Sequence, residues 1–143
     1  MALAQHTDYQ ELATIIPDSD IMSGAGYYHA VNQGVSGETL KNIVLTIKDR
    51  DVFAKVVGKD KTNLSKSYRL VKLPKIVGDS VVDTLRVYML ATRIYGSLEL
   101  ASEWLHSPIP ALGGEQPVSL LDSHAGRELV RQTLRKIEFG EYS

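Results

Sequence analysis

Residues 36–69, SGETLKNIVLTIKDRDVFAKVVGKDKTNLSKSYR, have the spacing that decides the fold class. Apolar side chains recur there every three or four positions, which is the period of a buried helical face. The first face consists of Leu40, Ile43, Val44 and Ile47, and the second of Val52, Phe53, Val56 and Val57. Because Asn-Gly and Asp-Gly hairpin turns are missing, the sequence predicts an all-α fold.

The helices in this stretch have the expected end signals. Ser36 can cap the first helix, and either Asp49 or Asp51 can begin the second. Gly58 can end the second helix, because glycine readily adopts the left-handed conformation that follows a helix. A third helix is predicted to begin near Thr62 after a short polar turn.

A short helix, a turn and a donor-rich helix form a helix-turn-helix, the usual arrangement of a DNA-reading element. Lys and Arg neutralise phosphates, and Ser, Thr and Asn hydrogen-bond phosphates or base edges. The predicted DNA-binding residues are Lys59, Lys61, Thr62, Asn63, Ser65, Lys66, Arg69 and Lys72. Since Arg69 is the only arginine among them, Asn63, Lys61 and Lys66 would have to make any base contacts. A plain helical hairpin with a solvated basic face is the alternative.

The charges of the chain are unevenly distributed. The formal net charge is −1, but residues 1–40 carry −5, residues 41–75 carry +7 and residues 76–143 carry −3. A basic middle between acidic flanks is typical of a localised site for a polyanion. A lysine-rich solvated surface gives the same count, so charge alone leaves both interpretations open.

Residues 1–35 form an N-terminal segment of uncertain role. Tyr9, Leu12, Ile15 and Ile16 could form one helical stripe, which Pro17 would end. The glycines at positions 24, 26 and 34 predict an irregular, turn-rich surface segment.

Proline and glycine also divide the chain after residue 74. A helix capped by Asp79 or Ser80 is predicted to run to Tyr95, with its buried positions at Val82, Leu85, Met89 and either Thr92 or Ile94. Further helices are predicted from Ser97 to Pro108, from Pro117 to Leu121 and after Gly126. The last of these would bury Leu129, Val130, Leu134 and Ile137.

Composition excludes several functional classes. With no cysteine there is no disulfide and no thiolate chemistry, and a reducing cytoplasm is the expected location. No apolar run approaches the roughly 20 residues of a membrane span. Asp122-Ser123-His124 contains triad residue types, but consecutive residues cannot form a relay. We therefore expect no catalytic residue, no metal site and no cofactor.

The stretch from Ala91 to Gly140 resembles the toxin-binding domain of Xre/MbcA/ParS-type antitoxins from RES–Xre type II toxin–antitoxin systems. The resemblance rests on Ala91, Ile94-Tyr95-Gly96, Ala101, Trp104-Leu105, Pro108, Leu112-Gly113-Gly114, Pro117, Leu120-Leu121-Asp122-Ser123, Gly126, Val130, Leu134, Ile137 and Gly140. Trp104, the largest apolar side chain, is expected to anchor the core. Residues from about 36 onward also look like the Xre helix-turn-helix, so the resemblance covers about residues 36–140.

The resemblance implies an all-α antitoxin with an N-terminal Xre-type helix-turn-helix bundle and a small helical toxin-binding domain. The predicted units are the segment 1–35, the DNA-binding region 36–78 and the toxin-binding domain 79–143. Such antitoxins are homodimers that bind the operator of their own operon and regulate its transcription. They neutralise a RES-domain toxin, which consumes NAD, by covering its active site, and they are not enzymes.

Polar, regularly placed residues are the candidates for toxin contact. Arg127, Arg131 and Arg135 recur every fourth position on the last helix and predict a basic stripe suited to an interface. A solvated face paired with Glu128 and Glu138 is the alternative. Further candidates are the tail Glu141, Tyr142 and Ser143 and the loop Leu112, Gly113 and Gly114.

Two functional alternatives remain at this point. A stand-alone helix-turn-helix regulator without a toxin partner would share the DNA-binding half. A toxin-binding protein that has lost DNA binding would share the other half.

Overall fold

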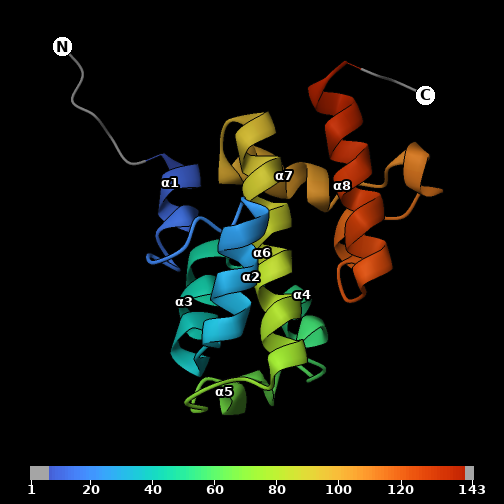
Figure 1. The fold of residues 1–143 in the computed structure, drawn as a ribbon. Helices are drawn as coiled ribbons and strands as arrows, with labels where there is room; N and C mark the ends of the chain where they lie inside the picture. The colour runs from blue at the N-terminus through green and yellow to red at the C-terminus, as the bar shows by residue number, and fades with distance from the viewer. Residues whose placement is uncertain (1–6, 141–143) are drawn as a thin grey trace.

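The computed structural model describes residues 7–140 and is helical throughout that range. It contains eight α-helices and two short 3-10 turns and has no strand among these residues, which confirms the predicted all-α class. The longest helix, α6 (Lys75–Tyr95), runs through the middle of the molecule (Figure 1). No helix in the described part of the chain is long and apolar enough to cross a membrane.

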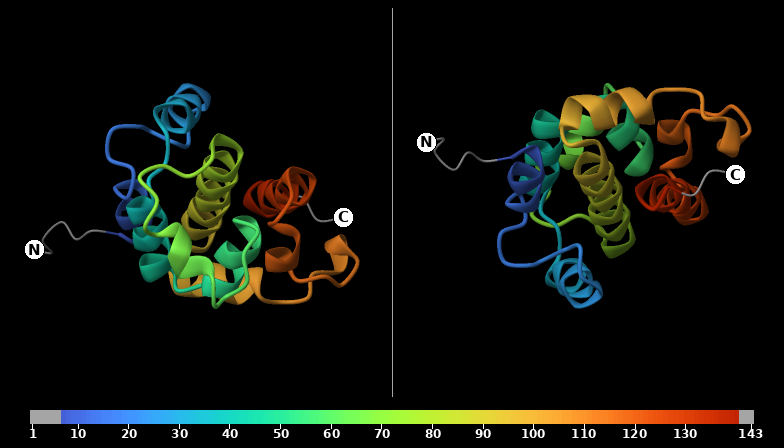
Figure 2. Two further views of the ribbon diagram at one scale, coloured as in Figure 1. Left: turned by 90° about the horizontal axis from the view of Figure 1, so that it is seen from below. Right: turned by 90° about the horizontal axis from the view of Figure 1, so that it is seen from above.

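Helix α6 contacts both halves of the chain. It packs against α1 (Asp8–Ala13), α2 (Gly24–Gln33) and α4 (Arg50–Val56), and also against α7 (Leu98–Leu105) and α8 (His124–Glu138). Figure 2, viewed from the two ends of the molecule, shows α6 between the N-terminal helices and α8. The buried apolar residues form one cluster that includes Leu12, Leu40, Phe53, Leu85 and Leu134. One core thus joins the regions on either side of residue 78, and the division there stays a prediction.

The two apolar faces in residues 36–57 are buried as predicted. Helix α3 (Gly37–Ile47) is capped by the hydroxyl of Ser36, which accepts a hydrogen bond from the Thr39 amide. Helix α4 begins directly after Asp49, although the Asp49 side chain makes no capping bond. Gly58 follows α4 with a positive φ of 75°, which agrees with its predicted place after the helix.

Two predictions are wrong, namely the irregular segment around the glycines at positions 24, 26 and 34 and the helix start at Asp79 or Ser80. Residues 24–33 form the regular helix α2, because Ser23 caps it and Gly26 lets its first turn approach the Asp20 carbonyl, where a Cβ would lie 1.8 Å from the oxygen. Helix α6 begins at Lys75 rather than at Asp79 or Ser80, because Pro74 supplies a fixed φ of −51° before it. Asp79 lies inside the helix, where its carboxylate accepts a hydrogen bond from the Tyr27 hydroxyl.

The C-terminal elements follow the predicted order. Ser97 caps α7, Pro117 begins the turn η2 (Pro117–Leu120), and Ser123 caps α8. The turn η1 (Pro110–Leu112) precedes Gly113 and Gly114, which both have positive φ. Val130 and Leu134 are fully buried, but Leu129 is 51% exposed, so the prediction that it faces inward is wrong.

Candidate functional site

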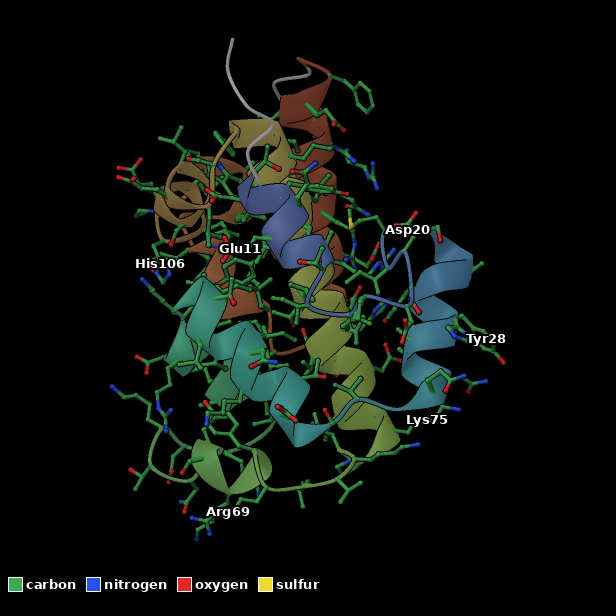
Figure 3. All side chains as sticks on the ribbon, turned by 90° about the vertical axis from the view of Figure 1, so that its left-hand side faces the viewer. Glu11, Asp20, Tyr28, Arg69, Lys75 and His106 are labelled. Carbon is green, nitrogen blue, oxygen red and sulfur yellow. The ribbon has the colours of Figure 1, made fainter. Side chains whose placement is uncertain are left out.

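The predicted DNA-binding residues gather at one end of the molecule, around the short helix α5 (Leu64–Ser67) (Figure 1). Figure 3 labels Arg69 at this end. We call the segment 59–72 the basic tip. Its exposed side chains include those of Lys59, Lys61, Thr62, Ser65, Lys66, Arg69 and Lys72, while Asn63 is half-buried.

Several of these donors already have partners within the chain. The Asn63 amide group donates to Asp60 Oδ1 at 2.9 Å, and Lys61 Nζ lies 3.4 Å from Asp51 Oδ1. Lys72 Nζ donates to the carbonyl of Gln33 at 2.8 Å. Among residues 7–140, the side chains of Lys59, Lys66 and Arg69 have no hydrogen-bond or ion-pair partner and are available to an anion.

The third predicted helix is only one turn long. At a rise of about 1.5 Å per residue, the four residues of α5 span roughly 6 Å, and two of them, Leu64 and Ser67, are buried. The Asn63 backbone N–H also bonds Asp60 Oδ1, so residues 60–63 form a turn instead of a helical start. After α5 the chain lies against residues 35–37 through two backbone hydrogen bonds. The Gly37 N–H donates to the Leu70 carbonyl, and the Leu73 N–H donates to the Val35 carbonyl.

Arg50 holds the basic tip in place, and sequence reasoning missed it. Its guanidinium donates to the Lys61 carbonyl at 2.8 Å and to the Tyr68 hydroxyl at 3.3 Å. The Arg50 guanidinium also lies 6.0 Å from the centre of the Tyr68 ring. Because these partners are 11 and 18 positions away, no local sequence pattern could identify them.

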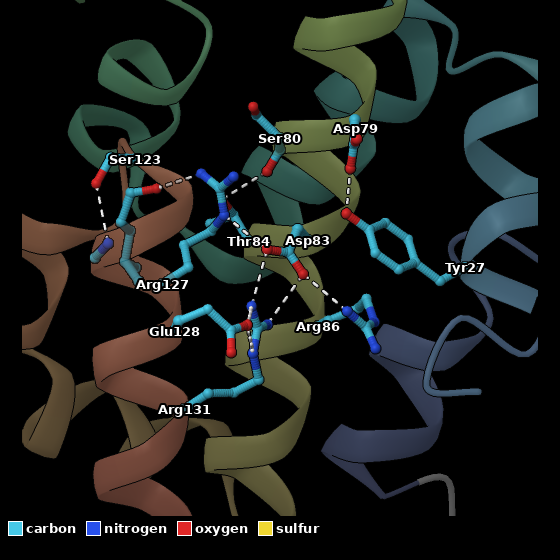
Figure 4. Close-up of polar contacts among 12 residues, drawn as sticks. Tyr27, Asp79, Ser80, Asp83, Thr84, Arg86, Ser123, Arg127, Glu128 and Arg131 are labelled. Atoms are coloured by element: carbon cyan, nitrogen blue, oxygen red, sulfur yellow. Dashed lines mark hydrogen bonds and ion pairs between the residues drawn. The ribbon is translucent and has the colours of Figure 1, made fainter. Parts of the chain in front are cut away.

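On helix α8, two of the three predicted basic-stripe residues point inward. Arg127 is 5% exposed, and its Nε donates to Asp83 Oδ2 at 2.8 Å. Arg131 donates from both terminal nitrogens to the two Asp83 oxygens, each at 3.0 Å (Figure 4). A step of four residues turns a helix by about 40° beyond a full circle. The stripe therefore drifts outward, and only Arg135 is exposed.

Asp83, which binds both arginines, is a second residue that sequence reasoning missed. It is 1% exposed and lies in α6, where a lone acid in the apolar run VVDTL was the available signal. Burial raises the pKa of Asp83, but hydrogen bonds from Arg131 and Arg127 outweigh burial and hold the pKa below its usual value. Burial lowers the pKa of Arg131, yet its bonds to Asp83 raise the pKa overall. The cluster is therefore charged.

The same carboxylate also reaches the N-terminal part of the chain. Arg86 donates from one terminal nitrogen to Asp83 Oδ1 at 2.8 Å and from Nε to the Ile21 carbonyl at 2.7 Å. The Arg86 guanidinium stacks over the Tyr27 ring, 4.1 Å from its centre. Burial and the hydrogen bond to Asp79 raise the pKa of Tyr27. A continuous polar chain thus joins α2, α6 and α8 (Figure 4).

The remaining toxin-binding candidates lie at the surface or outside the described residues. In the loop after η1, Gly113 and Gly114 are exposed and Leu112 is half-buried. Glu141, Tyr142 and Ser143 lie outside the described residues. Arg135 and the two loop glycines are thus exposed while Arg127 and Arg131 turn inward, so the six described candidates do not all lie on one exposed surface.

A second buried carboxylate, Asp49, lies beside an acidic groove. Its carboxylate accepts a hydrogen bond from the buried Tyr88 hydroxyl, and His106 Nε2 lies 2.8 Å from the same oxygen, Asp49 Oδ2. Burial and the Asp49 charge raise the pKa of Tyr88. His106 lines an open groove of about 870 Å³ between α1, the end of α3 and α7 (Figure 3). The carboxylate residues that line this groove are Asp8, Glu11, Glu99 and Glu103. This acidic surface disfavours DNA and leaves the basic tip as the region suited to it.

The described triad residue types at positions 122–124 are not arranged as a relay. The Ser123 hydroxyl caps α8 by accepting from the Gly126 amide at 3.0 Å, so it is not placed against His124. Within residues 7–140, no group of three His, Asp or Glu side chains is arranged to hold a metal ion.

Comparison with known proteins agrees with this arrangement. Residues 90–140 match the family described as antitoxin Xre/MbcA/ParS C-terminal toxin-binding domain. A protein named Prs ADP-ribosylating antitoxin, from Sphingobium sp. (strain YBL2), is 27% identical over 126 residues, which cover 79% of this chain and 78% of that protein. Residues 90–140 are therefore similar to the toxin-binding domain of Xre/MbcA/ParS antitoxins, and the chain as a whole is similar to an antitoxin.

Proposed function

We propose that this antitoxin neutralises a RES-type, NAD-consuming toxin by covering the entrance to its active site. The observation that carries the proposal is the match of residues 90–140 to a toxin-binding domain. The relative's name refers to ADP-ribosylation, a reaction that uses NAD, and this supports a toxin of that chemistry. The antitoxin itself performs no catalysis in this proposal.

We propose two different roles for the nine toxin-binding candidates. Arg135, the loop Leu112–Gly114 and the tail 141–143 are proposed to contact the toxin directly. Arg127 and Arg131 bind Asp83, so we propose that they act by holding α8 against α6.

Co-expression with the neighbouring reading frame tests this function. We expect that frame to encode a protein that lowers cellular NAD and stops growth when expressed alone. Both effects should disappear when this chain is co-expressed. Growth arrest that persists in the presence of this chain, or an arrest with unchanged NAD, would contradict the proposal.

We further propose that the protein binds its own operator as a homodimer in the cytoplasm and so regulates transcription. The basic tip supports this part, because its cations suit the phosphate backbone. Asn63 is bonded to Asp60 and α5 is one turn long, so phosphate contacts are expected to supply most of the affinity.

A mobility shift on operator DNA across a salt series tests DNA binding. Lys66→Ala and Arg69→Ala should each weaken binding and reduce the slope of log affinity against log salt by about 1. Lys48→Asn is the matched control. It removes one exposed charge outside the tip at a residue with φ of 62°, which asparagine tolerates.

The two experiments separate the alternative functions. A stand-alone regulator would bind DNA and have no toxic neighbour to neutralise. A protein that has lost DNA binding would neutralise the toxin and give no shift at any salt concentration. Sedimentation of the free protein tests the homodimer.

A further inference from the structure

Helix α8 has three faces with different surroundings. One face packs into the core through Val130 and Leu134. A second carries Arg127 and Arg131, which bind Asp83. The third continues just past the helix end and faces solvent along its whole length. We call it the outer stripe, and its exposed residues are Ala125, Leu129, Gln132, Lys136 and Phe139.

The outer stripe is unusually apolar for a solvated helical face. Leu129 is 51% exposed and Phe139 is 70% exposed. Ala125 is also apolar, which leaves Gln132 and Lys136 as the only polar members. Phenylalanine and arginine are both enriched at protein interfaces. Arg135 adjoins the stripe and is exposed.

The charges beside the stripe are free for a partner. Among the described residues, neither Arg135 nor Lys136 has an ion-pair partner on its side chain. The acids of the same helix are already engaged, because Glu128 binds Arg131 and Glu138 binds Arg93. The surface around the stripe is therefore positive.

Ion pairs fix α8 near both of its ends. Near its start, Arg127 and Arg131 bind Asp83 in the middle of α6. At its finish, Glu138 lies 2.8 Å from Arg93, close to the end of α6. Such a helix presents its outer face without further ordering, and this lowers the cost of binding.

The third large apolar residue that is exposed within residues 90–140 is less suited to docking. Leu100 on α7 is 49% exposed, but it stands between the exposed acids Glu99 and Glu103. Glutamate is depleted in interface cores. The matched segment thus offers one acidic face with a single large apolar residue and one basic face with two.

We propose that the outer stripe of α8 is the surface on which the toxin docks. This rests on the proposed antitoxin function and specifies its contact. The toxin surface that it fits has an apolar pocket for Phe139 and Leu129, with carboxylates facing Arg135 and Lys136. Arg127 and Arg131 do not touch the toxin.

Affinity for the purified product of the neighbouring reading frame tests the docking surface. Phe139→Ala and Leu129→Ala should each weaken binding at least tenfold, whereas Leu100→Ala should leave it unchanged. Because all three side chains are about half exposed or more, with Leu100 the lowest at 49%, the three variants should keep the wild-type urea midpoint. A double change of Arg135→Glu and Lys136→Glu should slow association, with a smaller effect at high salt.

The outcomes distinguish failure of the docking surface from failure of the proposed antitoxin function. If the wild-type chain binds the toxin and Phe139→Ala and Leu129→Ala bind equally well, the docking surface is wrong and the antitoxin function stands. Weakened binding by Leu100→Ala alone would assign docking to α7 instead. If the wild-type chain does not bind the product at all, the proposed function fails together with the docking surface.

Discussion

Asp83 and Arg131 form a two-point ion pair, in which each terminal nitrogen of the guanidinium lies 3.0 Å from a different carboxylate oxygen. Arg127 and Arg86 bind the same carboxylate, so one buried negative charge receives three cations from two helices. Asp79 and Glu128 lie at the outer ends of this chain of contacts. The positive and negative charges of the cluster are thus balanced inside the protein.

Asp83→Asn tests how much this cluster contributes to folding. The change leaves buried guanidinium groups without their carboxylate, which costs about 3–5 kcal/mol when one partner of a buried pair is removed. We expect urea unfolding to show a loss of this size. Asp122→Asn is the control, since Asp122 is exposed and has no side-chain bond within the described residues. An equal, small effect of both changes would refute a stabilising role for the cluster.

The depressed pKa of Asp83 gives stability a defined pH dependence. The unfolded chain binds a proton at Asp83 near the ordinary value of 3.8, whereas the folded chain does so only at lower pH. The contribution of this group is therefore complete above that value and is lost as the pH falls through the lower, folded pKa. In acid titrations followed by circular dichroism, the stability difference between wild type and Asp83→Asn should shrink below about pH 4. A difference that is constant from pH 7 to pH 2 would contradict this.

Gly126→Ala should disturb the start of α8. A Cβ at this position would lie 1.8 Å from the Leu120 carbonyl oxygen, so the helix and η2 would have to separate. We expect a loss of about 1–3 kcal/mol, as for other overpacked sites. Gly24→Ala is the matched control in the first turn of α2, where a Cβ meets nothing within 4 Å. It should be neutral or stabilising, and thermal unfolding measures both variants.

Trp104→Ala should have a moderate effect. The indole is half-buried rather than fully buried, and it stacks on the Tyr95 ring at a centroid distance of 6.1 Å. We expect a loss of about 1–3 kcal/mol, below the range for a fully buried tryptophan. Trp104→Phe should restore most of it. Since Trp104 is the only tryptophan, wild-type fluorescence reports directly on this contact during unfolding. A loss above that range would mean that the indole anchors the core as the sequence predicted.

The parts of the fold that sequence reasoning predicted are those set by local periodicity. The faces of α3 and α4 and the buried positions Val82, Leu85 and Met89 follow from apolar spacing alone. Helix α2 was missed because its glycines suggested irregular structure. The Ser23 cap and the approach of Gly26 to Asp20 depend on contacts that propensity does not describe.

The candidate site was harder to predict because its geometry depends on distant residues. Spacing placed Arg127, Arg131 and Arg135 on one helix, but only the position of Asp83 on a neighbouring helix determines which of them turn inward. The same holds for α5, whose length is limited by the pairing of residues 70–73 with residues 35–37. In both places, residues distant in the sequence determine the structure that a local sequence pattern adopts.

The run of contacts from the Ile21 carbonyl through Arg86 and Asp83 to α8 limits how this protein can be re-engineered. Consider a chimaera in which residues 90–140 are joined to a foreign DNA-binding region. It would lack Asp83, the carboxylate that binds Arg127 and Arg131 of α8. Such a graft would need to carry α6 from Lys75, which keeps Asp83 and Arg86 with the arginines of α8, although Arg86 would lose its bond to the Ile21 carbonyl. Natural recombination between related antitoxins meets the same constraint. Exchange points before residue 75 would keep Asp83 on the same segment as Arg127 and Arg131.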